Sequence, residues 1–335
     1  MRRKSSGTVR SRPLVPLAIL LLALCCQRAT ERVPDGETHF LRACTAESGD
    51  CGPDMICVCG ACLLPCEEVA DCADFGSPVQ CTASTDRVGG LDCTEPPTGT
   101  FCDVPCGTDT DCSDLGSGYH CSAGFCRTCP HGEVTGNEVV LLGDVFIAQD
   151  HEVTIQLEAL AREAGTLTIG EHYRDYSSVT QNALALGDAL LGDRYQEALA
   201  ESPVSVVIMD GGGSDMLLGT CETPPTSDCP VIVDAVAAAE QLLAQMAQDG
   251  VGRVLWFFYP DPADAVLRAK LDVIHPLLQA VCESSAVPCY WLDLQPTFAG
   301  HFGEYMQTDF VPTPLGAQAA ASAIWATMEQ NCIAQ

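Results

Sequence analysis

The sequence is poor in basic residues. Of its 335 residues, 16 are basic and 45 are acidic, which gives a net charge of -29. Lys4 lies near the start, and Lys270 is the single lysine after it. Five of the bases and none of the acids lie within the first 24 residues, so the rest of the chain has 11 bases, 45 acids and a net charge of -34. Nucleic acids are bound through Lys and Arg. The composition therefore excludes them as partners and favours a soluble monomer.

Long apolar runs are also missing. The run from Leu14 to Leu24 follows a basic stretch that ends at Arg12. As a helix it would span about 16 Å, which is short of the ~30 Å hydrocarbon core of a bilayer. No later segment reaches about 18 uninterrupted apolar residues. The pattern indicates a signal peptide for export and not a membrane-spanning helix.

The end of this run resembles a bacterial lipoprotein signal. Residues 22–25 read Leu-Ala-Leu-Cys, and in such signals the cysteine is acylated and becomes the first mature residue. Leu24 is bulkier than the pattern prefers, so the lipid would be attached to Cys25 or Cys26. The resemblance implies a signal peptide over 1–25, a linker over 26–43 and a lipid anchor to a membrane at the cell envelope or cell surface. Ordinary cleavage and secretion is the alternative.

A cysteine-rich module is expected over 44–130. Fifteen of the 86 residues from Cys44 to Cys129 are cysteine, more than the ~8–10% that is typical of a disulfide scaffold. Large apolar residues are scarce there, so covalent bridges must replace a hydrophobic core. The reducing cytosol would keep such cysteines as thiols, which again favours export.

The module contains a duplication. Two sets of four cysteines share the spacings x3, x5 and x8 and lie 40 residues apart: Cys62, Cys66, Cys72 and Cys81, then Cys102, Cys106, Cys112 and Cys121. Each copy has a proline before its second cysteine. We therefore expect two similar bridged units.

Zinc is the competing interpretation of two Cys-x-x-Cys pairs, Cys59 with Cys62 and Cys126 with Cys129. In an exported chain with this many cysteines, disulfides are favoured. We expect no metal and no cofactor.

The number of cysteines predicts one long-range bridge. Beyond Cys26 there are 20 cysteines, 15 in the module and five after it. The pairs Cys221–Cys229 and Cys282–Cys289 are close enough in sequence to close local loops. Cys332 then has no neighbour and the module has an odd cysteine, so we expect Cys332 to bond near the module's end, at Cys129.

The residue pattern changes after the module, and a parallel α/β domain is expected over 136–335. Short β-branched or aromatic runs alternate with longer helical patterns. Such alternation predicts a parallel sheet covered by helices on both faces, a three-layer fold of the flavodoxin type. The expected strands are 138–143, 204–209, 253–259 and 290–294, and the expected helices are 151–164, 231–246, 263–281 and 315–328.

Ligands of such sheets bind beyond the carboxyl ends of the strands, so the loops there are the first place to look for chemistry. Residues 142–146 read Leu-Gly-Asp-Val-Phe, residues 210–215 read Asp-Gly-Gly-Gly-Ser-Asp, and residues 308–316 read Thr-Asp-Phe-Val-Pro-Thr-Pro-Leu-Gly. The order and placement of these segments resemble the SGNH (GDSL-type) esterase and lipase family over about residues 138–330. A further segment, 174–180, resembles the family's oxyanion-hole segment.

The resemblance includes the loss of the family's catalytic residues. The family has a nucleophilic Ser after Gly-Asp, an oxyanion-hole Gly and Asn, and an Asp and a His near the C-terminus. The corresponding positions here are Val145, Thr180, Ser214, Thr308 and Val311. A one-residue gap aligns Asp309 with the family Asp, but no register supplies the His. Since the reaction needs a hydroxyl nucleophile and an imidazole base, the resemblance implies a hydrolase fold without the hydrolase chemistry.

Four histidines could in principle act as a displaced base: His151, His172, His275 and His301. On sequence alone each is better interpreted as a surface or packing residue.

A vestigial pocket at Asp144, Val145, Gly213, Ser214 and Asp215 could still bind an acyl or glycan ligand. Two alternatives remain open. One is an active esterase with a relocated site, and the other is an adhesion or structural protein that acts through its cysteine-rich repeats.

Overall fold

The structure is a computed structural model, and it describes residues 40–42, 44, 51–52, 54–58, 60–75, 79–83, 98–115, 119–122, 124–129, 134–179, 183–187 and 190–334. The proposed signal peptide, the lipidation sites Cys25 and Cys26, and Thr180 lie outside the described residues.

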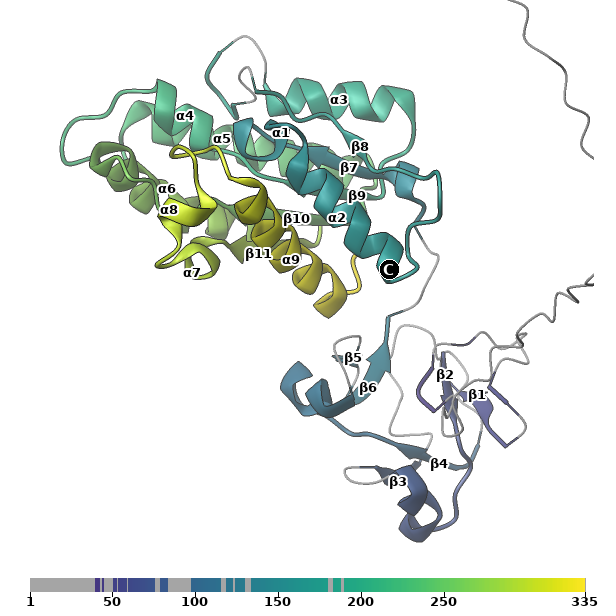
Figure 1. The fold of residues 1–335 in the computed structure, drawn as a ribbon. Helices are drawn as coiled ribbons and strands as arrows, with labels where there is room; N and C mark the ends of the chain where they lie inside the picture. Colours follow the sequence, from purple (N-terminus) through teal and green to yellow (C-terminus); the bar gives the residue numbers. More distant parts are fainter. Residues whose placement is uncertain are drawn as a thin grey trace, which may run out of the picture. The chain divides into compact units, whose positions relative to one another are not determined.

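A five-stranded parallel sheet forms the centre of the larger region (Figure 1). Its strands are β7 (Val139–Leu142), β8 (Arg174–Asp175), β9 (Val206–Met209), β10 (Arg253–Phe258) and β11 (Cys289–Asp293). Across the sheet they follow the order β8-β7-β9-β10-β11, and every pair of neighbours is parallel. In chain order this is 2-1-3-4-5, the doubly wound order of flavodoxin. The predicted fold class is confirmed.

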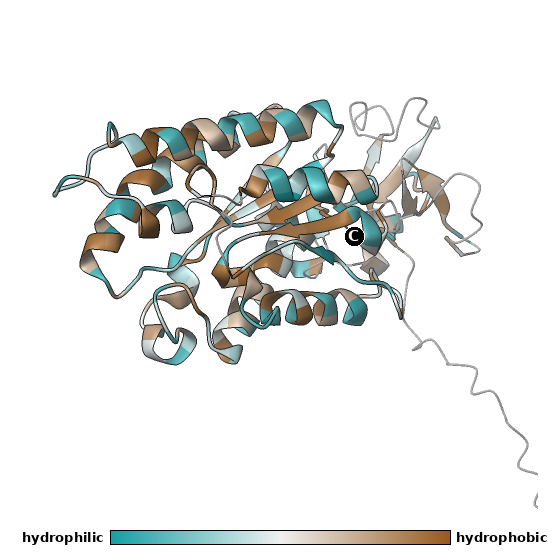
Figure 2. Ribbon diagram, turned by 90° about the horizontal axis from the view of Figure 1, so that it is seen from above, coloured by the Kyte–Doolittle hydropathy of each residue, from teal (hydrophilic) through white to brown (hydrophobic). Residues whose placement is uncertain are grey.

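The strand sequences explain which strands are central. The residues of β7 and β9 are all buried, because both faces of these strands are covered and their Val, Leu, Ile and Met side chains have no polar side to expose. In contrast, every residue of β11 is partly exposed, as expected for an edge strand. Figure 2 shows the apolar strands lying between the helices.

Helices cover both faces of the sheet (Figures 1 and 2). Right-handed crossovers that run in opposite directions from β7 place α2 on one face and α3, α5 and α6 on the other. The C-terminal helix α9 returns to pack against α2, and α5 packs against α6. The bounds are α2 (Glu152–Glu163), α3 (Leu191–Glu201), α5 (Pro230–Gln248), α6 (Ala265–Glu283) and α9 (Pro314–Gln330).

Several short elements were not expected from sequence. They are β8, α3, the 3-10 helix η4 (Gly136–Glu138), and the short helices α1 (Val145–Ala148), α4 (Gly213–Leu218), α7 (Gln295–Phe298) and α8 (Phe302–Tyr305). Two of them, α1 and α4, begin directly after β7 and β9 and so lie at the carboxyl edge of the sheet.

Helix α5 is long and apolar enough to cross a membrane by length and composition alone. In the folded domain it is a core helix, because Val231, Ile232, Leu242 and Leu243 on one side of it are buried.

The described residues of the cysteine-rich region form small antiparallel strand pairs and two 3-10 helices. The strands are β1 (Ile56–Val58), β2 (Ala61–Leu63), β3 (Gln80–Ala83), β4 (Thr100–Asp103), β5 (Tyr119–Ser122) and β6 (Phe125–Thr128), and the 3-10 helices are η1 (Val69–Phe75) and η3 (Asp109–Leu115). They pair as β1-β2, β3-β4 and β5-β6, each antiparallel. The hydrophobic cluster of this region also includes Phe40 and Leu41, which the sequence analysis had assigned to the linker.

The two sequence repeats have the same local structure. In the first, Pro65 forms an isolated antiparallel β-bridge with Phe101, and the Cys66 N–H donates to the Thr100 carbonyl at 3.0 Å. In the second, Pro105 bridges Phe125, and the Cys106 N–H donates to the Gly124 carbonyl at 2.9 Å. The duplication of cysteine spacing is therefore a duplication of structure.

Disulfides follow the repeat. Within each copy the second and fourth cysteines are bonded to each other. The third is bonded to a cysteine on a later strand, which is β4 for the first copy and β6 for the second. The bridges are Cys66–Cys81 and Cys72–Cys102 in the first copy, and Cys106–Cys121 and Cys112–Cys126 in the second. Two further bridges, Cys44–Cys57 and Cys51–Cys62, close the segment before the repeats.

The three bridges expected from parity and proximity are also present. Cys221–Cys229 and Cys282–Cys289 close loops of 8 and 7 residues, and Cys129–Cys332 spans 203 residues. The long bridge joins the last cysteine of the module to the end of the α/β region.

One buried ion pair supports the second repeat. The guanidinium of Arg127 on β6 donates two hydrogen bonds of 2.7 Å, one to each oxygen of Asp103 on β4. The Asp103 side chain is fully buried. Such two-pronged geometry compensates a carboxylate that has lost its water.

Candidate functional site

The polar groups at the carboxyl edge of the sheet form one buried network. Asp144 follows β7, Asp210 follows β9 and Tyr259 follows β10, and all three are buried. The two carboxyl groups are bridged by the Tyr259 hydroxyl, which lies 2.9 Å from Asp144 Oδ2 and 3.1 Å from Asp210 Oδ1. Parallel pairing of β7, β9 and β10 brings these distant residues together.

Asp144 organises the start of helix α1. It is the N-cap, and its Oδ1 accepts a hydrogen bond of 3.2 Å from the Phe146 N–H. Its Oδ2 accepts hydrogen bonds from the Ser214 N–H at 3.1 Å and from the Ser214 hydroxyl at 3.0 Å. The Ser214 hydroxyl, which the sequence resemblance aligns with an oxyanion-hole Asn, therefore donates to a carboxylate within the protein.

Burial raises the pKa values of both members of the carboxyl pair. It raises the pKa of the Asp144 carboxyl, and hydrogen bonds from Phe146, Tyr259 and Ser214 oppose the shift. It raises the pKa of Asp210 well above its usual range, and the nearby Asp144 charge raises it further. Asp210 Oδ2 is buried without a hydrogen-bond partner among the described residues. Both pKa values are therefore raised, and burial together with the Asp144 charge raises that of Asp210.

The glycines of these loops make room for the network. A Cβ on Gly143 would lie 2.8 Å from Asp210 Oδ1, and a Cβ on Gly213 would lie 2.7 Å from the Tyr259 ring and 2.9 Å from the Phe310 ring. Both positions exclude any side chain without displacement of a neighbour. Phe310 packs edge-on against Tyr259, with ring centroids 5.0 Å apart.

Asp215 anchors a neighbouring loop. Its carboxylate accepts hydrogen bonds from the N–H groups of Leu184, Ala185 and Leu186 at 2.8, 2.9 and 3.0 Å. Burial raises the pKa of Asp215, and these backbone hydrogen bonds oppose the shift. The residue therefore has a structural role in the loop at 184–186.

Val145 is the first residue of α1, the position that the family resemblance gives to the nucleophile. Its side chain is partly exposed and has only carbon atoms. The segment of the family's oxyanion Gly lies nearby, because the Ser178 N–H donates to the Gly143 carbonyl at 3.1 Å. Val145 thus begins the helix with an aliphatic side chain that has no nucleophilic atom.

The residues that the sequence resemblance aligns with the acid and base positions take part in backbone hydrogen bonds. The Val311 carbonyl accepts a hydrogen bond of 2.7 Å from the Gln307 N–H. Thr308 is exposed, and Asp309 accepts hydrogen bonds from the N–H groups of Ala263 and Asp264 at 2.5 and 3.2 Å. Asp309 therefore stabilises the segment just before α6. In the alternative register, which aligns Asp309 with the family Asp, its carboxylate is bonded to backbone N–H groups and not to an imidazole.

Three of the four histidines have local structural partners. His301 is exposed, stacks on Tyr305 and lies 3.3 Å from Glu304. His172 pairs with Glu158 at 2.9 Å. His275 lies within α6, and its ring stacks on that of Phe258 with centroids 4.5 Å apart.

His151 lies in a different setting, beside a carboxylate that also accepts hydrogen bonds from hydroxyl groups. This setting was not predicted from the sequence. Its Nδ1 lies 3.0 Å from Asp175 Oδ2, at the carboxyl end of β8. Asp175 Oδ1 also accepts hydrogen bonds from the N–H and the hydroxyl of Ser177, and Oδ2 accepts one from Thr154. A Ser, a His and an Asp are thus brought together, but the serine hydroxyl donates to the carboxylate and not to the imidazole.

The cysteine clusters of the described residues do not offer a metal site in this oxidised state. In that part of the chain, groups of three sulfur or imidazole ligands lie close together at four places, and every cysteine in them is bonded in a disulfide. Cys62, Cys126 and Cys129 of the proposed zinc pairs are among these bonded residues, and Cys59 lies outside the described residues.

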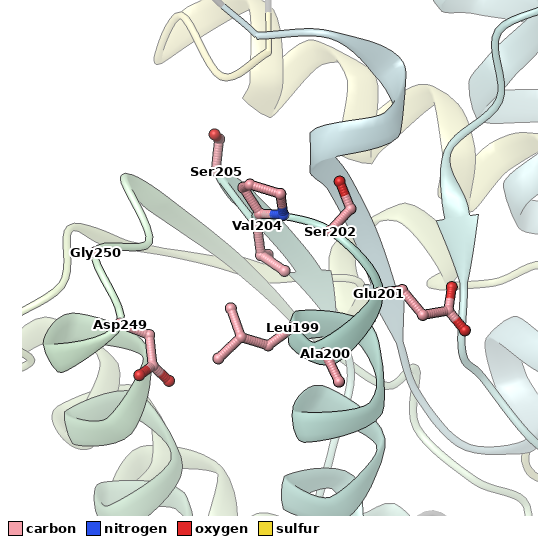
Figure 3. Close-up of a pocket in the computed structure, with 9 residues that line it drawn as sticks. Leu199, Ala200, Glu201, Ser202, Val204, Ser205, Asp249 and Gly250 are labelled. Atoms are coloured by element: carbon pink, nitrogen blue, oxygen red, sulfur yellow. The ribbon is translucent and has the colours of Figure 1, made fainter.

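Two of the cavities formed by the described residues lie away from the carboxyl network. One, of about 530 Å³, lies at the amino end of β9 and is lined by residues 199–205, Asp249 and Gly250 (Figure 3). Asp249 accepts a hydrogen bond from the Tyr195 hydroxyl at 3.1 Å. The other, of about 410 Å³, lies between the segment after α4 and the first turns of α6.

Comparison with known proteins gives structural likenesses only. No model of a protein family matches the chain, and no curated protein sequence matches it. Among solved structures it is similar to LAE5, an alpha/beta hydrolase from the metagenome of Lake Arreo, Spain, at 20% identity and a TM-score of 0.45 over 60% of this chain and 97% of that one. It is also similar to the acetyl xylan esterase AlAXEase at 12% identity and a TM-score of 0.43, covering 56% of this chain and 97% of that one. A catalytic mutant of Axe2, an acetylxylan esterase from Geobacillus stearothermophilus, has 15% identity and a TM-score of 0.42, covering 58% of this chain and 94% of that one.

Proposed function

We propose that this protein is an exported surface protein, attached to a membrane by a lipid on Cys25 or Cys26, whose esterase-like α/β domain binds an acylated or carbohydrate ligand without cleaving it. The cysteine-rich module would then separate this domain from the anchor. The proposal is based on the signal pattern of residues 1–26 and on the side chains that follow the carboxyl ends of the strands.

One observation carries the non-hydrolytic part of the proposal: Val145 occupies the helix start where the family has its nucleophile. Acyl transfer needs an oxygen that attacks the carbonyl carbon and a base that takes its proton. In subtilisin, loss of the serine or the histidine alone costs on the order of 10⁶ in turnover. Here the adjacent Ser214 hydroxyl already donates to Asp144, so it offers no substitute.

A hydrolysis assay tests this part. Purified protein is incubated with p-nitrophenyl acetate and, separately, with a fluorophosphonate probe that labels activated serines. We expect no turnover above the buffer rate and no labelling, both for the natural protein and for Val145→Ser, because a restored hydroxyl would still lack a base. Turnover in the natural protein would contradict the proposal.

Ligand binding and anchoring need separate measurements. A thermal-shift screen with acetylated oligosaccharides and acylated peptides should raise the unfolding temperature for at least one ligand class, and silence across the set would count against binding. Growth with an alkyne fatty acid should label the protein, and the label should be lost in the Cys25→Ser, Cys26→Ser double variant. An unlabelled natural protein would instead support plain secretion.

A second candidate is an esterase with a relocated site, favoured by the cluster of His151, Asp175 and Ser177. It ranks below the first because Ser177 donates to Asp175, so the imidazole does not lie between nucleophile and carboxylate as in a triad. Fluorophosphonate labelling that disappears in Ser177→Ala or Ser178→Ala, and falls in His151→Ala, would establish this candidate.

A further inference from the structure

The cavity beside α6 has predominantly apolar walls. One side is the segment from Gly219 to Pro225, and the other is the first turns of α6, including Ala265, Val266 and Ala269. The disulfide Cys221–Cys229 closes the first wall into a loop of 8 residues. Because this loop is covalently closed, the cavity of about 410 Å³ is largely pre-formed.

Lys270, the single lysine after Lys4, also lines this cavity. The residue is only 9% exposed, and its ammonium donates to the carbonyl oxygens of Met216 and Gly219. An ammonium has three protons to donate, so these two carbonyls leave one for another acceptor.

The charge of Lys270 has no close counterion. Within the part of the chain that the structure describes, no carboxylate oxygen lies within 4.0 Å of its nitrogen. Burial lowers the pKa of Lys270, and the charge of Asp264 opposes that shift without forming an ion pair. A buried ammonium is costly unless an anion compensates it.

Exposed apolar side chains lie beside the cavity. Val266, on its α6 wall, is 61% exposed, and Leu217 and Leu218, just before Gly219, are 55% and 48% exposed. An apolar chain that entered the cavity would cover the Val266 side chain and gain the hydrophobic free energy of burial.

We propose that this cavity binds a carboxylic acid with an apolar chain of fatty-acid type, with its carboxylate paired to the Lys270 ammonium and its chain along Pro224, Pro225 and Val266. The acidic exterior repels anions in general, so a buried cation in an apolar cavity gives this class of ligand a local advantage. The proposal does not depend on whether the domain hydrolyses esters.

Lys270 also has a purely structural interpretation, because lysine side chains commonly satisfy carbonyls at helix ends and Met216 belongs to α4. If Lys270 has only this structural role, its substitution lowers the stability of the protein, and the protein binds no added carboxylic acid. A binding experiment separates the two.

The test is calorimetric titration of the mature protein with sodium octanoate and, in parallel, with 1-octanol. We expect one saturable site for octanoate and at least about tenfold weaker binding of octanol, equivalent to ~1.4 kcal/mol. Lys270→Met, which keeps an apolar stem but removes the charge, should weaken octanoate binding by at least the same factor.

A second variant keeps the test decisive if Lys270→Met does not fold. Val266→Trp changes an exposed side chain on the cavity wall and should block octanoate binding. Val233→Trp is the matched control: Val233 is 48% exposed on α5 and does not line the cavity, so binding should be unchanged. The proposal is overturned if octanoate does not bind, if octanol binds equally well, or if Val266→Trp binds octanoate like the natural protein.

Discussion

The two regions of this molecule are stabilised in different ways. In the cysteine-rich region, five of the 13 residues of the buried cluster are disulfide-bonded cysteines. In the α/β region, only Cys229 and Cys282 belong to the buried cluster, which otherwise consists of apolar residues from the sheet and its helices. A small region cannot bury enough apolar surface to offset its chain entropy, so covalent closure makes up the difference.

The tryptophans make this comparison easy to measure. All three, Trp256, Trp291 and Trp325, lie in the α/β region. Tryptophan fluorescence therefore follows the unfolding of that region, and hydrogen exchange of peptides from 60–129 follows the other. The two regions must be measured separately, because a single free energy of unfolding is not defined for a chain whose parts unfold apart.

The largest expected difference concerns matched leucines. Leu141 on β7 and Leu63 on β2 are both fully buried. Leu141→Ala leaves a cavity between rigid layers and should lower the free energy of unfolding seen by fluorescence by about 3–5 kcal/mol. Leu63→Ala should leave that transition unchanged and lower only the hydrogen-exchange protection of the module, by about 2–3 kcal/mol, because its few neighbours can collapse. Equal shifts of the fluorescence transition would show that the regions unfold as one.

The next comparison removes one bridge from each region. Cys72–Cys102 closes 30 residues and Cys282–Cys289 closes 7. Loop-closure entropy gives contributions of about 3–4 and about 2 kcal/mol. Replacing both Cys72 and Cys102 by Ala should abolish exchange protection in the module, while the same change at Cys282 and Cys289 should shift the fluorescence transition but keep it cooperative. A module that keeps its protection would mean that its apolar cluster suffices.

The features that sequence could predict are the local ones. The β-branched run at Val206–Met209 identifies a central strand, because both faces of such a strand are covered. One long-range feature was also predicted: the odd number of cysteines in each region indicated a bridge between them, and Cys129 was expected as the partner of Cys332 because it lies near the module's end. In contrast, β8 has two polar residues, Arg174 and Asp175, so it has no hydrophobic pattern and exists only by pairing with β7.

In the candidate site, too, the sequence predicts local features but not contacts between distant residues. The motif predicted that Val145 would follow a strand, but not that it would begin the short helix α1. Tyr259 was interpreted as the last residue of a strand, and its role depends on hydrogen bonds to Asp144 and Asp210, 115 and 49 positions away. Register across three strands creates that contact, and no local pattern encodes it.

The buried carboxyl groups provide the last comparison. In the module, Asp103 is compensated by Arg127. In the α/β region, the donors to Asp144 and Asp210 among the described residues are all neutral: the Tyr259 and Ser214 hydroxyls and backbone N–H groups. The pH dependence of stability should therefore be concentrated in the α/β region.

Asp210→Asn tests this expectation. Because burial raises the pKa of Asp210 in the folded state, its stabilising contribution is present below the unfolded pKa of ~3.9 and is lost as pH rises through the higher folded value. An amide at this position still accepts the 2.9 Å hydrogen bond from the Asp144 N–H but never ionises. In urea unfolding followed by fluorescence from pH 4 to 8, the variant should gain about 1–3 kcal/mol relative to the natural protein toward the alkaline end. Asp234→Asn, exposed on α5, should run parallel to the natural protein, and a parallel profile for Asp210→Asn would show that the carboxyl pair does not control the pH response.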